Sequence, residues 1–196
     1  MKKFNDYEKT QSYASTGAKL PAGGYVLRIE NVRYENGQNG SSDRLVLMYD
    51  IAEGEQKDFY RNQYASQTSE DKKWKGTMQI YIPSDDGTEQ DGWAKKRFKT
   101  VMEHFEASNK GYVWDWDENK LKGKYIGGLF GEINTVIEGK NITYVGFRFT
   151  ESAEKIRSGN FKVPAPYSKG GAAPAKPSAI NDGFVNVTGT QEEIPF

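Results

Sequence analysis

The sequence predicts an all-β domain, a β-barrel with one helix, followed by a disordered C-terminal tail. Three observations on the 196-residue chain lead to this fold class. Apolar and polar residues alternate in several short segments, which is the period of a β-strand. One longer segment, residues 91–107, instead carries apolar residues at helical spacing. Residues 164–178 consist mostly of Pro, Ala, Gly and Ser, a composition that cannot bury a core.

Three strands are expected first, at residues 24–34, 44–52 and 77–82. The turn signal at residues 20–24 precedes the first strand. The alternation of this strand breaks at Val32, which predicts a β-bulge near Glu30 and Asn31. A hairpin loop is indicated by the composition of residues 36–42, and residues 57–64 fit either a short strand or an ordered loop.

The helical segment at residues 91–107 follows the third strand, with Asp91 as its expected N-cap. Two further strands are expected at about residues 123–137 and 141–150, joined by a turn at residues 138–140. Five strands with a helix between the third and the fourth have the order of an OB-fold, a five-stranded barrel. The alternative is a small α+β sandwich with the helix on one face.

The chain divides into four parts by composition. Residues 1–20 are a polar N-terminal arm, and residues 21–163 form the predicted barrel domain. Residues 164–190 are a flexible linker and residues 191–196 a short tip. The apolar residues between 180 and 187 are compatible with local packing or with a second contact point.

Composition argues against several classes of function. The chain has no cysteine, which excludes disulfides and thiolate metal sites. It has one histidine, His104, so the usual pairing of a nucleophile with a histidine is disfavoured. We expect no enzyme, no cofactor and no metal. Neither a transmembrane run nor a signal peptide is apparent, which predicts a cytoplasmic protein. Lys and Arg equal Asp and Glu at 27 each, so any nucleic-acid site must come from local clustering of charge.

The tip has the chemistry of a docking peptide. Two carboxylates precede an apolar end that Pro195 stiffens, which suits a basic-rimmed apolar pocket on another protein. The residues expected to bind this partner are Glu192, Glu193, Ile194, Pro195 and Phe196.

This ending resembles the acidic tail tip of bacterial single-stranded-DNA-binding proteins. With Leu-Pro-Ala-Gly-Gly-Tyr at 20–25 and Asp-Ile-Ala-Glu-Gly-Glu at 50–55, residues 4–150 resemble single-stranded-DNA-binding proteins encoded by phages and prophages of Gram-positive bacteria. The tip carries fewer acids than is usual in that family, and the first strand does not match the cellular bacterial proteins. The resemblance implies binding and protection of single strands in DNA replication, recombination and repair, recruitment of partner enzymes by the tip, and action in the bacterial host cytoplasm.

Binding single strands without sequence preference requires cations for phosphates and exposed aromatic faces for bases. Residues 57–75 interleave both kinds, and we expect the contacts there from Tyr60, Arg61, Tyr64, Lys72, Lys73, Trp74 and Lys75. A second set lies on the non-core side of the first three strands: Arg28, Arg33, Arg44 and Tyr81. The alternative is that these aromatics cap the barrel and these cations are only solvated. The basic run on the helix at residues 95–99 is expected to be a solvated face, and Trp114 and Trp116 are expected to pack.

Two other functions remain open. Zero net charge favours a protein-interaction adaptor, whereas residues 57–75 favour DNA binding. A single-strand annealing protein or recombination mediator would carry the same features as a coating protein. A homo-oligomer is compatible with a barrel of this kind, but no strand indicates an interface.

Overall fold

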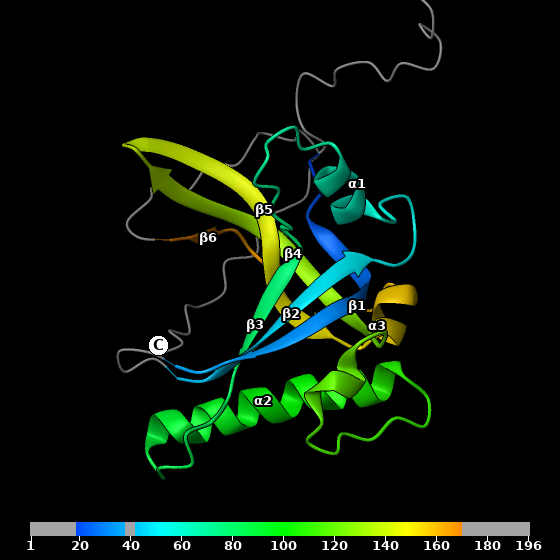
Figure 1. Ribbon diagram of the computed structural model, residues 1–196, viewed down its shortest axis with the longest axis vertical. Coiled ribbons are helices and arrows are strands. Elements are labelled where there is room, and N and C mark those ends of the chain that lie inside the picture. Colours follow the sequence, from blue (N-terminus) through cyan, green and yellow to red (C-terminus); the bar gives the residue numbers. More distant parts are fainter. Residues whose placement is uncertain (1–18, 38–41, 170–196) are drawn as a thin grey trace, which may run out of the picture.

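The computed structural model describes residues 19–37 and 42–169 (Figure 1). The fold is mostly β, with six strands in one sheet that does not close in the described residues. The neighbouring strands are, in order, β3 (Thr77–Tyr81), β2 (Arg44–Ile51), β1 (Gly23–Glu35), β4 (Tyr125–Ile137) and β5 (Lys140–Glu151). The sixth strand, β6 (Tyr167–Ser168), pairs in parallel with β4.

All five expected strands form, and the expected long helix, α2 (Glu89–Ser108), lies between β3 and β4. The prediction of a single helix is wrong. Two short helices, α1 (Phe59–Ala65) and α3 (Ala153–Arg157), and the 3-10 helix η1 (Glu118–Leu121) are also present. Helix α1 occupies the segment for which a short strand or a loop was expected. Figure 1 shows α2 across one end of the sheet and α1 towards the opposite end.

The predicted β-bulge is confirmed, because the β1–β2 register shifts between Ile29 and Asn31. Leu27 and Ile29 are fully buried before the shift, and Val32 packs against the core after it. The predicted turn between β4 and β5 is also confirmed, with positive φ angles at Glu138 (50°) and Gly139 (75°). Two such residues form the primed turn that suits the twist of a hairpin.

Helix α2 buries Phe98, Val101, Met102 and Phe105 against the sheet, at the spacing that the sequence indicated. Its N-cap, however, is Thr88, whose side-chain oxygen accepts a hydrogen bond from the Asp91 backbone N–H at 3.2 Å. The prediction of Asp91 as the cap is therefore wrong by one turn. Asp91 is instead a buried acid within the first turn, paired with Lys95 at 2.7 Å.

A second, smaller cluster covers the other face of the sheet, where α3 packs Ala153 and Ile156 on Val26. Ser152 caps α3 by accepting a hydrogen bond from the Lys155 backbone N–H. The chain then continues to β6, so residues 167–168 of the predicted linker pair with the sheet. Residues 1–18 of the predicted arm, 170–190 of the linker and the tip at 191–196 lie outside the described residues. None of the described helices is long and apolar enough to cross a membrane.

Candidate nucleic-acid interface

Helix α1 depends on a carboxylate that comes from β2. Asp50 is 1% exposed, and its carboxylate accepts hydrogen bonds from the backbone N–H groups of Tyr60 (2.9 Å) and Arg61 (3.1 Å). A negative charge at the start of a helix satisfies free N–H groups and complements the helix dipole. Asp58, which precedes α1, has a left-handed φ of 59° and makes no side-chain cap. Burial raises the pKa of Asp50 above its ordinary value.

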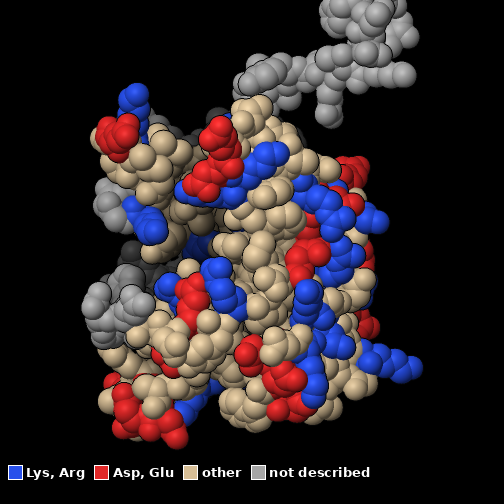
Figure 2. Space-filling view, in the orientation of Figure 1, with Lys and Arg blue, Asp and Glu red and all other residues tan. Residues whose placement is uncertain are grey.

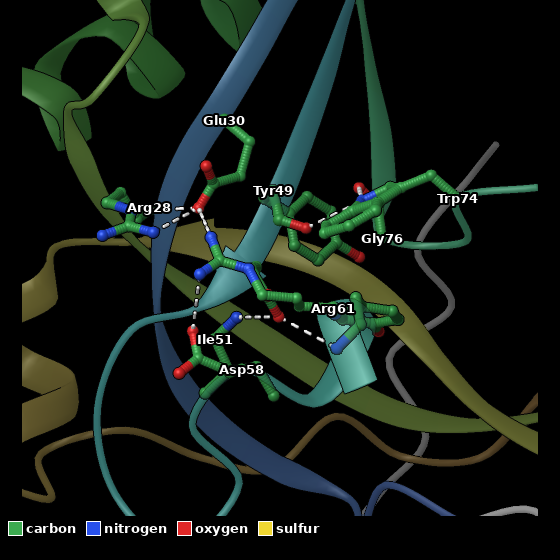
Figure 3. Close-up of polar contacts among 10 residues, drawn as sticks. Arg28, Glu30, Tyr49, Ile51, Asp58, Arg61, Trp74 and Gly76 are labelled. Carbon is green, nitrogen blue, oxygen red and sulfur yellow. Dashed lines mark hydrogen bonds and ion pairs between the residues drawn. The ribbon is translucent and has the colours of Figure 1, made fainter. Parts of the chain in front are cut away.

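The loop between α1 and β3 is held at both ends. The Gln67 side chain forms two hydrogen bonds with the Lys73 backbone, each 2.8 Å long. The indole N–H of Trp74 donates to the backbone carbonyls of Tyr49 and Gly76, both at 3.1 Å (Figure 3). Glycine is needed at position 76, because a Cβ atom there would lie 2.3 Å from the Tyr49 carbonyl oxygen. The loop is therefore fixed to the sheet at Trp74.

This anchoring sets Tyr64 and Trp74 side by side on the surface. Their ring centroids are 5.9 Å apart, with 46° between the ring planes. Tyr64 is 39% exposed, whereas Trp74 is partly buried. The Lys72 ammonium lies 5.8 Å from the centre of the Tyr64 ring. We call Tyr64, Trp74 and Lys72 the aromatic step.

Cations surround the aromatic step. Lys73 is paired with Asp71 at 3.3 Å. Within the described part of the chain, Lys72 and Lys75 have no carboxylate within ion-pair distance. These two side chains are therefore available to a phosphate, whereas Lys73 would have to exchange partners.

The strand residues of the second predicted set lie on the non-core face, as the alternation indicated. Arg44 is opposite Tyr81 in the β2–β3 register, and Arg33 is opposite Val46 in the β1–β2 register. Arg28 is opposite Asp50, close to the start of α1. Tyr81 is 50% exposed.

The arginines on this face form ion pairs with glutamates, and each glutamate contacts two arginines. Glu30 contacts Arg28 at 2.6 Å and Arg61 at 3.6 Å, which joins α1 to β1 (Figure 3). Glu35 contacts Arg33 at 2.7 Å and Arg44 at 2.8 Å.

These ion pairs keep both partners charged. The hydrogen bond from Arg44 holds the pKa of Glu35 below its ordinary value, and the hydrogen bond to Glu30 raises the pKa of Arg28. The group of Arg33, Arg44 and Glu35 has one positive charge in excess. In the other group Arg61 also contacts Asp58 at 3.9 Å, so its two arginines are balanced by two carboxylates. We call these two groups the arginine pairs.

Tyr60 cannot serve as a stacking surface. It is 8% exposed and packs edge-on against Tyr49, with ring centroids 5.4 Å apart. Burial raises the pKa of Tyr60 to about 12. Tyr60 therefore leaves the set of candidate DNA contacts and belongs to the core that supports α1.

Sequence reasoning missed Asp50, which looked like an ordinary outward residue of β2. No local pattern shows that its carboxylate caps a helix that begins nine residues later. It also missed Tyr34, which is 43% exposed beside Arg33 and hydrogen-bonds Asp43. Its position next to an arginine in a strand was a usable signal. Trp116 was expected to pack but is 77% exposed.

Figure 2 shows acidic and basic side chains interleaved over this view, with a hollow between the β4–β5 hairpin and the β1–β2 hairpin. In the part of the chain that the structure describes, no three His, Cys, Asp or Glu side chains are grouped as a metal site. No protein-family model matches the chain, and a search of curated proteins finds no significant match. Function must therefore be argued from the residues themselves.

Proposed function

We propose that this protein binds single-stranded DNA without sequence preference, using the aromatic step for bases and its neighbouring cations for phosphates. An OB-type barrel is the fold we propose for it. The sheet order β3-β2-β1-β4-β5, with α2 between β3 and β4, supports this because a partly open barrel of that order would bring β3 and β5 together.

The observation that carries the proposal is the aromatic step, with lysines beside it that have no carboxylate partner among the described residues. Trp74 is anchored to the sheet by its indole N–H and holds the partly exposed Tyr64 ring beside Lys72 and Lys75, so an aromatic face and phosphate-binding charges lie together. Bases stack on such rings whatever their identity, and lysines bind phosphates as point charges. The arginine pairs extend the cationic surface along β1 and β2.

The test is a titration of the full chain with a labelled oligo-dT strand and with a matched duplex, each at about 50 mM and about 200 mM salt. We expect tight binding to the single strand, quenching of tryptophan fluorescence, and weaker binding as salt increases. Trp74→Phe keeps an aromatic face but loses the indole N–H, and Trp93→Ala removes a 64%-exposed indole elsewhere on the surface as a control. Equal affinity for strand and duplex, or no binding to either, would refute the proposal.

A protein-interaction adaptor is the second candidate, and the arginine pairs favour it. Four of the predicted DNA contacts already have glutamate partners, so a phosphate would have to compete for them. An adaptor would show no response to either DNA. If a partner protein then binds the full chain but not a chain that lacks residues 191–196, the tip is the contact that the adaptor uses.

We further propose that the tip recruits replication or recombination enzymes, in the cytoplasm of a bacterial host. This division of labour predicts that deleting residues 191–196 leaves affinity for the single strand nearly unchanged or slightly higher, since acidic residues compete with phosphate. A large loss of affinity on that deletion would contradict it.

A further inference from the structure

An apolar pocket lies on α2, apart from the aromatic step and the arginine pairs. Its volume is about 620 Å³, within the range of sites that bind side chains or small ligands. Phe98 and Met102 of α2, Ile82 and Pro83 after β3, and Trp114 and Trp116 supply its apolar lining. No part of the proposed DNA surface lines it.

Trp116 makes this pocket unusual. It is the most exposed large hydrophobic side chain of the described residues, at 77%. Its backbone has a φ of 68°, a left-handed conformation that is strained for a bulky residue. The indole lies parallel to the Phe98 ring, with 6.0 Å between centroids and 10° between planes. An exposed aromatic face therefore lines the pocket beside Phe98.

The charges around the pocket indicate what would enter it. Asp85, Glu103 and Glu106 line it together with only two lysines. Lys95 is already shared by Asp85 and Asp91, and Lys120 is shared by Asp115 and Asp117 beside Trp116. Figure 2 shows acidic and basic side chains next to one another along the lower edge of the molecule, over α2 and the loop beside it. The lining therefore has one carboxylate more than ammonium groups, and Glu103 is paired with Lys99 at 3.7 Å. A rim of this charge favours an apolar side chain that has lysines next to it over one that has acids next to it.

We infer that the pocket receives the segment Lys2-Lys3-Phe4 of a second copy of this chain. The segment places an aromatic ring directly after two lysines, which matches the apolar lining and the acidic rim. Fifteen residues lie between Phe4 and the buried Leu20, enough to span about 50 Å when extended. In Figure 1 the described chain begins near the end of the sheet opposite α2, so the arm is attached far from the pocket of its own molecule.

The first experiment measures fluorescence anisotropy of a labelled peptide of residues 1–7 added to the full-length Phe4→Ala chain, whose own arm no longer competes. We expect saturable binding that weakens about tenfold or more in a Trp116→Gly background. Glycine accepts the left-handed φ, so this change removes the indole while keeping the loop conformation. Glu103→Gln should weaken binding chiefly at low salt. Val113→Ala is the control, since Val113 is 72% exposed in the same loop but does not line the pocket.

A second experiment follows the unaltered full-length chain by sedimentation velocity over a range of concentrations. Self-association that both Phe4→Ala and Trp116→Gly abolish supports the inference. A chain that stays monomeric while the peptide binds would overturn it, because the pocket would then be filled from within the same molecule. Two other results would also overturn it. One is that a peptide of residues 187–196 binds as tightly as the 1–7 peptide, and the other is that the 1–7 peptide displaces bound oligo-dT from the protein. Each outcome is independent of whether the aromatic step binds single strands.

Discussion

Replacing Tyr64 with alanine should weaken binding to an oligo-dT strand by about 1–3 kcal/mol, the range for one base stacked on an aromatic side chain. That energy corresponds to an increase of about 5- to 150-fold in Kd. The fold should survive, because Tyr64 is 39% exposed and lies in the last turn of α1, where alanine is the best helix former. Loss of the contact with Lys72 adds little at an exposed site.

The assay is anisotropy of a labelled oligo-dT strand at several salt concentrations, with thermal unfolding as a check on folding. Tyr64 carries no charge, so Tyr64→Ala should lower affinity without changing the slope of log K against log salt. Lys72→Gln is the matched variant, because losing one phosphate contact to a single strand reduces that slope by about 0.7. The two variants thus separate stacking from phosphate neutralisation within one small surface.

Two results would refute this reasoning. A folded Tyr64→Ala protein with unchanged affinity would show that no base stacks on Tyr64. A change in salt slope equal to that of Lys72→Gln would show that Tyr64 acts only by orienting the lysine. In the first case Trp74, the lysines and the arginine pairs would have to account for the binding. In the second case Tyr64 would belong to an electrostatic site.

Three further predictions concern charge, packing and pH. Glu30→Gln should raise the affinity for a single strand at low salt and steepen the dependence of that affinity on salt, because Arg28 and Arg61 lose their shared carboxylate. A lower affinity would instead mean that Glu30 orients the two arginines. Gly76→Ala should lower the free energy of unfolding, measured by urea denaturation, by about 1–3 kcal/mol. Gly92→Ala is the control, because Gly92 has open space around it in α2, and it should raise this free energy by about 0.5–1 kcal/mol. Equal effects of the two changes would contradict the close approach of residue 76 to Tyr49. Burial lowers the pKa of His104, so its contribution to stability is present above about pH 6.5 and is lost as pH falls, when the unfolded chain takes up the proton first. Urea unfolding of wild type and His104→Gln at about pH 7.5 and about pH 5.5 should show a smaller loss in the variant; identical losses would exclude His104 as the cause.

The sequence predicted the parts of the fold that depend on local period. The alternation of β1 even revealed its bulge, because Val32 had to leave the phase of Leu27 and Ile29 to reach the core. The long helix was equally clear from its apolar spacing. What sequence could not show was α1, which has seven residues and no cap of its own. Isolated helices that short are unstable, so α1 exists because tertiary contacts to Asp50 and Tyr49 hold it.

The candidate site shows the same division. Composition brought out residues 57–75, and alternation placed Arg28, Arg33 and Arg44 on the non-core face. Composition could not tell Tyr60 from Tyr64, because only the direction of α1 decides which ring enters the core. Nor could it anticipate β6, whose two residues pair with β4 from within a stretch with the composition of a linker.

Zero net charge is compatible with a surface that binds phosphate when acids and bases are arranged as they are here. Glu35 serves both Arg33 and Arg44, so one guanidinium of that group is left uncompensated, whereas Asp58 adds a second carboxylate beside Arg61. The pocket on α2 has the opposite balance, with three carboxylates and two lysines in its lining. Single strands would therefore be attracted to the β1–β2 face and the aromatic step rather than to the pocket. Because exposed charges are screened by salt, this preference would act most strongly at low ionic strength. Exchanging the charges of Glu103 and Lys72 should weaken it without changing the net charge.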